Sequence, residues 1–146
     1  MKIREAEHAD LRGLLELYTH LNVNPMPAEI GEDIYALWRE MLADKNHHIV
    51  LADEDGVIVS SCIAIIVPNL THVQRPHAVV ENVVTHAEHR GRGYATAVMD
   101  YARELARNEN CYKIMLMTGS KQKNVLDFYV NCGYNTKDKT GFVQWL

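Results

Sequence analysis

Two arginines and two glycines alternate between Arg90 and Gly93, at the junction of a valine-rich run and a helical run. The run Val79–Thr85 contains four valines, which predict a buried β-strand. Apolar residues between Val98 and Ala106 recur at the spacing of an amphipathic helix. Glycine lets backbone N–H groups approach a ligand closely, and the N-terminus of a helix carries a partial positive charge. The stretch therefore predicts a binding site for a diphosphate.

Two common kinds of phosphate loop do not match this stretch. A P-loop requires four residues between its glycines and then Gly-Lys-Ser or Gly-Lys-Thr, and this pattern is absent. A dinucleotide fingerprint requires a third glycine where Thr96 stands, and the next predicted strand, Lys113–Thr118, lacks the terminal acidic residue that binds a ribose. The remaining pattern is Arg-x-x-Gly-x-Ala, from Arg90 to Ala95, directly after a strand and at the start of a helix.

The Arg90–Ala95 hexapeptide resembles the acetyl-coenzyme A loop of the GNAT acyltransferase superfamily, whose pattern is Arg/Gln-x-x-Gly-x-Gly/Ala. A second stretch, Asn124–Tyr134, is similar to the Asn…Phe-Tyr-x-x-x-Gly-Phe/Tyr signature of the same superfamily. Together the two motifs extend the resemblance over nearly the whole chain. The resemblance implies a single-domain α/β GNAT fold, with a mixed, mostly antiparallel sheet flanked by about four helices, and acetyl-coenzyme A as co-substrate.

The second motif implies a role for a tyrosine hydroxyl. In this superfamily the tyrosine points at the thioester sulfur and the asparagine contacts the pantetheine or phosphate arm, and these residues correspond to Tyr129 and Asn124. Proton transfer to the leaving thiolate is chemically reasonable, because a thiol has a pKa of about 8.5 and a phenol one of about 10. Tyr129 also fits the apolar stripe of an amphipathic helix, so a core aromatic is the alternative.

Glu81 lies in the middle of an apolar strand, where a carboxylate costs free energy unless it is paired or solvated, so we expect it to face a cleft. Its position matches the strand carboxylate with which many GNAT enzymes deprotonate the ammonium group of the acceptor, directly or through water. We expect Glu81 to be the general base, because an amine attacks only as the neutral nucleophile. A structural ion pair with Arg75, or with another basic residue, is the alternative.

The strand that carries Glu81 is expected to separate from its neighbour near Val83–Thr85, which leaves backbone groups free to pair with the pantetheine amides. The N–H of Val83 would polarise the acetyl carbonyl. Main-chain N–H groups of the loop would bind the diphosphate, with the two arginines adding charge; a solvated basic turn is the alternative. The residues that the resemblance assigns to the cofactor are Val83, Val84, Thr85, Arg90, Gly91, Arg92, Gly93, Tyr94, Ala95 and Asn124.

The elements expected to position these residues follow one another as β-α-α-β-β-β-α-β-α-β-β. The strand-like runs are Ile3–Ala6, His48–Ala52, Val57–Val67, Val79–Thr85, Lys113–Thr118, Tyr134–Thr136 and Phe142–Leu146. The last of the four helical runs is Asn124–Cys132, which Gly133 is expected to end as a left-handed cap. Asp53–Gly56 predicts a tight hairpin turn, and Pro68–Pro76 predicts a polar loop.

Composition and charge narrow the functional class. A length of 146 residues predicts one domain, 1–146, with a single core. The net charge of −4 argues against a broad nucleic-acid surface, and no apolar run approaches the ~20 residues that span a bilayer. Three isolated cysteines and the lack of a signal-peptide core favour a cytoplasmic protein. The eight histidines match no metal-site pattern, so we expect no metal. The sequence is compatible with a homodimer but does not predict the oligomeric state.

We therefore predict an acetyl-coenzyme A-dependent N-acetyltransferase that acts on a small primary amine, such as an amino sugar or a polyamine, by direct attack in a ternary complex. Residues 80–84, 111–114 and 128–134 look closest to small-molecule enzymes such as glucosamine-6-phosphate N-acetyltransferase. These stretches lie in the cofactor half, so they indicate the donor and not the acceptor. Acceptor specificity is expected from residues 21–30 and 69–77. A protein or peptide acetyltransferase and a coenzyme A-binding module without turnover are the alternatives.

Overall fold

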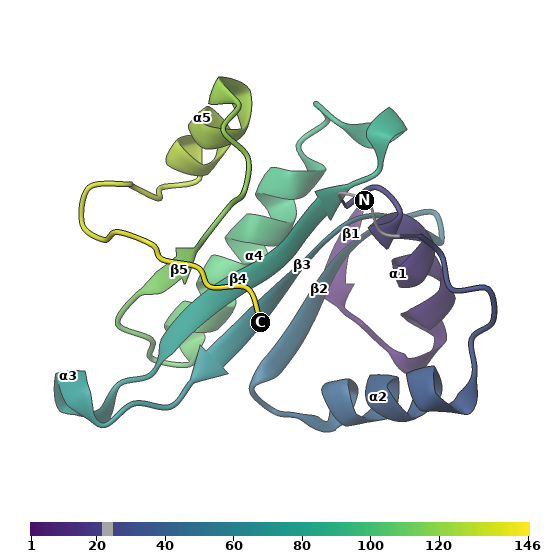
Figure 1. The fold of residues 1–146 in the computed structure, drawn as a ribbon, viewed down its shortest axis with the longest axis horizontal. Helices are drawn as coiled ribbons and strands as arrows, with labels where there is room; N and C mark the ends of the chain where they lie inside the picture. The colour runs from purple at the N-terminus through teal and green to yellow at the C-terminus, as the bar shows by residue number, and fades with distance from the viewer. Residues whose placement is uncertain (22–24) are drawn as a thin grey trace.

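A five-stranded sheet forms the middle layer of the protein, and Figure 1 shows helices on both of its faces. The structure is a computed structural model, and it describes residues 1–21 and 25–146. The strand order is β1-β2-β3-β4-β5, in which the first four strands are antiparallel neighbours and β5 runs parallel to β4. This architecture confirms the predicted α/β single domain with a mixed, mostly antiparallel sheet.

The elements agree with most of the predicted runs. The strands are β1 (Lys2–Glu5), β2 (His47–Glu54), β3 (Val57–Val67), β4 (His77–Thr85) and β5 (Ile114–Leu116). The helices are the 3₁₀ helix η1 (His8–Asp10), α1 (Leu11–Tyr18), α2 (Glu32–Ala43), α3 (Thr71–Gln74), the 3₁₀ helix η2 (Ala87–His89), α4 (Tyr94–Asn108) and α5 (Lys123–Asn131). β5 is shorter than predicted at both ends. In the part of the chain that the structure describes, no helix has the length and apolar character needed to cross a membrane.

Two apolar clusters cover the two faces of the sheet. The cluster on the α4 side contains Val50, Val59, Cys62, Val80, Val98, Met99 and Ala102. The cluster on the α1 and α2 side contains Leu14, Leu17, Trp38, Ile49, Leu51, Ile63 and Val84. Because successive strand residues point to opposite faces, the cluster to which a strand residue belongs tells which face its side chain occupies.

The hairpin between β2 and β3 has the predicted tight turn. Asp55 and Gly56 both have positive φ, 54° and 85°, and Glu54 pairs directly with Val57. Two central residues with positive φ are typical of a type I′ turn, whose twist matches that of the flanking strands. The Asp53 carboxylate accepts a hydrogen bond of 2.8 Å from the Gly56 N–H, which stabilises the turn.

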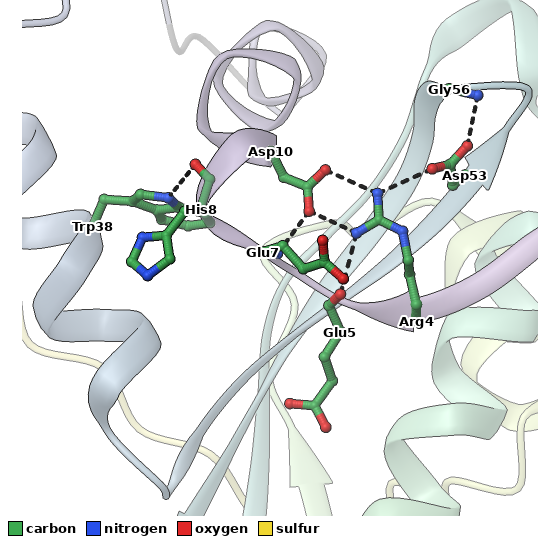
Figure 2. Close-up of polar contacts among 8 residues, drawn as sticks. All are labelled: Arg4, Glu5, Glu7, His8, Asp10, Trp38, Asp53 and Gly56. Atoms are coloured by element: carbon green, nitrogen blue, oxygen red, sulfur yellow. Dashed lines mark hydrogen bonds and ion pairs between the residues drawn. The ribbon is translucent and has the colours of Figure 1, made fainter.

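Arg4 on β1 joins the N-terminal strand to two other elements (Figure 2). Its guanidinium donates to both carboxylate oxygens of Asp10, at 2.6 and 2.9 Å, and to Asp53 at 3.0 Å. Nearby, the Trp38 indole N–H donates to the carbonyl of His8 at 3.1 Å, which ties α2 to η1. The hydrogen bonds from the Arg4 guanidinium hold the pKa of Asp10 and that of Asp53 below their ordinary values, and its charge adds to the effect.

Replacing Asp10 by Asn should lower the free energy of unfolding by about 2 kcal/mol at pH 7, because it removes a charge-assisted bidentate contact that is only 11% exposed on the Asp10 side. The folded-state pKa of Asp10 lies below its unfolded value of about 3.9. Its stabilisation is therefore complete above that pH and is lost as the pH falls toward the folded-state pKa. Urea unfolding of Asp10→Asn at pH 7 and at pH 3 measures both effects. Glu16→Gln, an exposed change on α1, is the control and should differ little from wild type; an equal loss at both pH values contradicts the prediction.

Two predictions about the chain outside the central elements are wrong. Neither Tyr134–Thr136 nor Phe142–Leu146 forms a strand in the described chain, and Phe142 and Trp145 are 88% and 89% exposed. The alternation of apolar and polar residues in these segments is typical of a strand. A strand, however, requires a hydrogen-bonded neighbour, and within a single chain neither segment pairs with the sheet. The predicted loop Pro68–Pro76 contains α3, a left-handed turn with φ between 53° and 58° from His72 to Gln74.

Candidate active site

β4 and β5 separate after Val80, so the predicted gap at Val83–Thr85 is present but begins earlier along β4. The two strands pair only between Ala78–Val80 and Ile114–Leu116. The rest of β4 remains paired with β3 on its other side, up to Thr85 opposite Ser60. The backbone N–H and C=O groups of the second half of β4 that point toward β5 therefore have no strand partner, and an extended amide-containing ligand can pair with them.

A β-bulge occurs where the strands separate. Asn82 has a positive φ of 50°, and the register with β3 shifts between Ser61 and Ile63. The extra residue turns Val83 toward the α4 cluster and Val84 toward the α1 and α2 cluster. The bulge thus sets which way the backbone of this half of β4 faces.

Two hydroxyl groups support the bulged half of β4. The buried Ser60 hydroxyl donates to the carbonyl of Val84 at 2.8 Å and lies 2.8 Å from the Thr85 hydroxyl. Tyr18, at the end of α1, has its side chain beside Asn82 and Ser61, and burial raises the pKa of its hydroxyl to about 12. These contacts hold the strand edge in place before any ligand binds.

The loop before α4 has the backbone of an anion site. Gly91 and Gly93 have positive φ of 73° and 84°, a conformation that favours glycine. A Cβ atom at either position would meet nothing within 4 Å, so there is open space in front of both. Gly93 caps α4 and has no side chain to bond the helix, and the Ala97 N–H donates to the Gly93 carbonyl at 3.0 Å. The N–H groups of the first turn are therefore available to an anion.

A pocket of about 340 Å³ lies between the strand edge, this loop and α5. It brings together most of the residues that the sequence assigned to a cofactor, and it adds the predicted acid Tyr129. The residues that line it are His20, Val83, Val84, Thr85, His89, Arg90, Gly91, Gly93, Tyr94, Ala95, Thr96, Val125, Phe128 and Tyr129. The open strand edge, the exposed N–H groups and the basic loop fit the chemistry of a pantetheine arm joined to a diphosphate.

Three of the predicted site residues do not line this pocket: Glu81, Arg92 and Asn124. Arg92 and Asn124 are exposed. Glu81 is exposed as well and pairs with Ile63, which belongs to the α1 and α2 cluster. Directly paired residues point to the same face of a sheet, so the Glu81 side chain lies on the face opposite to α4. The predicted base is thus reached from one face of the sheet, and the pocket with Tyr129 from the other.

Tyr129 is held by the end of α5. Gly133, with a φ of 95°, follows the helix as the predicted left-handed cap, and the Tyr134 N–H donates to the Tyr129 carbonyl at 3.1 Å. The Tyr129 ring packs with Phe128 and Tyr134, at centroid distances of 5.0 and 6.5 Å. Burial raises the pKa of its hydroxyl, and the thiols of Cys132 and Cys62 add to the rise. The hydroxyl therefore stays protonated at neutral pH, which a proton donor requires.

Arg75 does not supply the ion pair considered for Glu81. Its guanidinium donates to the carbonyls of Asn110 and Cys111, at 3.1 and 3.0 Å, and so connects the start of β4 to the loop before β5. Residues 22–24, part of the stretch expected to choose the acceptor, lie outside the described residues. Within residues 1–21 and 25–146, no group of three or more His, Cys, Asp or Glu side chains could hold a metal ion.

The pocket includes residues that sequence reasoning did not assign to it. Val125 stands four positions before Tyr129 and three before Phe128, and this helical spacing was a usable signal for a shared face. His89 directly precedes the arginine loop, but the histidines were considered only as metal ligands. His20 comes from the end of α1, far away in the sequence, and no local pattern identifies it.

Comparison with known proteins agrees with this geometry. The model of the Acetyltransferase (GNAT) family matches residues 13–134. The chain is 32% identical over 142 residues to glucosamine 6-phosphate N-acetyltransferase 1 of Oryza sativa subsp. japonica, covering 94% of this chain and 82% of the relative. It is 28% identical over 141 residues to glucosamine 6-phosphate N-acetyltransferase of Trypanosoma brucei brucei, covering 95% and 92%.

A solved structure from Agrobacterium tumefaciens str. C58, assigned as an acetyltransferase without a named substrate, superimposes with a TM-score of 0.93 at 42% identity, and all of both chains is covered. The family match spans most of the chain, and it includes β4, the glycine loop and α5. The chain therefore belongs to the GNAT family and is an N-acetyltransferase.

Proposed function

We propose that acetyl-coenzyme A is the acetyl donor and that the pocket between β4, the glycine loop and α5 holds its pantetheine and diphosphate. The observation that carries this proposal is the open edge of β4 beyond Val80, which leads directly to the uncapped N-terminus of α4. The edge offers backbone partners to the pantetheine amides, and the loop offers N–H groups to the diphosphate. Arg90 and Arg92 add positive charge beside it.

The catalytic chemistry divides between the two faces of the sheet. Glu81, exposed on the α1 and α2 face, accepts a proton from the ammonium group of the acceptor, directly or through a water molecule. The neutral amine then attacks the acetyl carbonyl, whose oxygen receives a hydrogen bond from the Val83 N–H. As the new C–N bond forms and the C–S bond breaks, the Tyr129 hydroxyl donates its proton to the leaving sulfur, and the proton that the attacking nitrogen then loses returns through solvent to the tyrosinate. The gap between β4 and β5 is where the two substrates meet.

A small primary amine is the acceptor class that we propose, with amino sugar phosphates the first to be tested. This choice draws on two relatives of about 30% identity that are named glucosamine 6-phosphate N-acetyltransferases. A thiol-release assay should cover amino sugars, amino sugar phosphates, polyamines and lysine peptides. We expect the highest kcat/KM with a small amine; a preference for peptides identifies a protein acetyltransferase instead. Release from none of the amines, with acetyl-coenzyme A still bound, favours a binding module.

Acetyl-coenzyme A should raise the melting temperature. At about 100 times its dissociation constant, a ligand that binds only the folded state adds about 2.7 kcal/mol to the free energy of unfolding. For a chain of this size such a gain corresponds to a rise of several degrees, measured by calorimetry. ATP and NAD are the control ligands, and they should act much less because they lack the pantetheine arm that pairs with β4. Equal stabilisation by ATP and acetyl-coenzyme A contradicts the proposal.

We also propose that the protein works as a homodimer. Phe142, Val143 and Trp145 are exposed in a segment whose alternation is typical of a strand. On the side away from β4, β5 has no strand neighbour within the described residues. Exposed apolar segments of this kind commonly mark interaction surfaces, and a second copy would provide both a strand partner and apolar cover. Light scattering should therefore give twice the mass of one chain; the mass of one chain contradicts the dimer.

A further inference from the structure

Three histidines from different elements meet at the edge of the cofactor pocket. His20 follows α1, His86 follows β4 and His89 ends η2. The ring centroids of His20 and His86 are 4.1 Å apart, and those of His86 and His89 are 5.3 Å apart. His20 and His89 line the same pocket as Arg90 and the two glycines, whereas His86 does not line it and lies directly behind them. The cluster therefore stands beside the N–H groups that are expected to bind a diphosphate.

The surroundings of this cluster are predominantly basic. Burial lowers the pKa of His20, and the neighbouring His86 and Arg90 lower it further, whereas Glu88 acts in the opposite direction. The Glu88 side chain is itself exposed. The Nδ1 atom of His86 accepts a hydrogen bond of 3.2 Å from the Glu88 N–H, so this imidazole carries its proton on Nε2 in the present geometry.

On the far side of the cluster, the Nδ1 atom of His89 lies 3.3 Å from a carboxylate oxygen of Glu54. The Tyr94 hydroxyl and the Arg92 charge both lie close enough to Glu54 to lower the pKa of its carboxyl. The Glu54 carboxylate is thus engaged with His89 and its neighbours, and it does not neutralise His20. Two imidazoles at stacking distance cannot both be protonated readily beside an arginine, unless an anion is bound between them.

We propose that His20 and His86 hold a phosphate group of coenzyme A and that His20 takes up a proton when the cofactor binds. The inference rests on the proposed function, because it adds a ligand from α1 to the cofactor site described above. The phosphate is either the diphosphate or the 3′-phosphate of the adenosine, since both are anions of the same chemistry. Proton uptake makes cofactor affinity depend on pH: binding tightens as the pH falls, because the bound state holds one more proton than the free state.

Isothermal titration calorimetry with coenzyme A tests the proposal on the full chain. Titrations at pH 7 in two buffers of different ionisation enthalpy give the number of protons taken up, and titrations from pH 8 to pH 6 give the affinity profile. We expect the wild-type protein to take up a substantial fraction of one proton when coenzyme A binds. Protonation of His20 should make this binding about tenfold tighter at pH 6 than at pH 8. In His20→Gln, the uptake from this site should disappear and the profile should flatten.

The design separates His20 from other titrating groups. The secondary ionisation of the 3′-phosphate, near pH 6, belongs to the ligand, and titration with 3′-dephospho-coenzyme A, which lacks this group, removes its contribution. His8→Gln is the matched control, because His8 is exposed and its backbone carbonyl, not its ring, accepts the hydrogen bond from Trp38. It should keep the wild-type profile. Thermal unfolding without ligand establishes that His20→Gln is folded, and His86→Gln, which should also flatten the profile, provides a second variant.

Each outcome has a defined meaning. The same proton uptake and pH profile in His20→Gln as in wild type overturns the inference while leaving the donor proposal intact. Failure of the wild-type protein to bind coenzyme A overturns the proposed function itself. Titration with 3′-dephospho-coenzyme A then identifies the phosphate. A difference between wild type and His20→Gln that persists with this ligand assigns the contact to the diphosphate, and one that disappears assigns it to the 3′-phosphate.

Discussion

Replacing Tyr129 by Phe should lower kcat and kcat/KM together by about 10² to 10⁴, the range typical of a general acid. The change keeps the ring, and with it the packing on Phe128 and Tyr134, so the fold and the affinity for acetyl-coenzyme A should stay close to wild type. Only the interaction with the departing sulfur is removed, and that interaction develops in the transition state. Rapid-mixing measurement of thiol release follows the chemical step directly.

Tyr134→Phe is the matched control for this experiment. Tyr134 belongs to the same ring cluster, and its buried hydroxyl has no hydrogen-bond partner in the described structure. Removing that hydroxyl should leave kcat unchanged, and it costs no hydrogen bond to the fold. A Tyr129→Phe enzyme with wild-type kcat, under conditions in which chemistry limits the rate, shows that Tyr129 is only a core aromatic.

Replacing Glu81 by Gln should lower kcat by about 10² or more, because it keeps the shape of the side chain and removes the proton acceptor. The loss should be largest at low pH, since an alkyl amine with a pKa of about 10 is then almost entirely protonated. At high pH, free amine is already present and the base matters less. Steady-state rates from pH 6 to pH 9 measure this dependence.

Cofactor affinity separates the two roles considered for Glu81. The residue does not line the pocket and faces the α1 and α2 side, so Glu81→Gln should bind acetyl-coenzyme A like wild type. Glu16→Gln, an exposed carboxylate change elsewhere, should alter neither rate nor affinity. If Glu81→Gln loses turnover and cofactor binding together, the residue is structural, and the base is water or another side chain.

The sequence by itself determined the parts of this protein that depend on near neighbours along the chain. The β-branched residues of β3 predicted its bounds correctly, Asp55 and Gly56 predicted the hairpin turn, and Gly133 predicted the end of α5. Each of these features follows from the φ preference or the side-chain spacing of a few consecutive residues. The same locality made the glycine loop and Tyr129 identifiable as site residues, although the catalytic role of Tyr129 stays a prediction.

Only the tertiary structure decided how distant segments meet. The bulge at Asn82 exists because one residue of β4 has no counterpart in the register of β3, and this register also decides which face Glu81 occupies. His20 reaches the cofactor pocket because α1 packs across the sheet beside the end of β4. The alternation of Phe142–Leu146 predicted a strand, but strand formation depends on a free partner edge. Register, packing and pairing are relations between residues far apart in the chain, so no local pattern of residue types contains them.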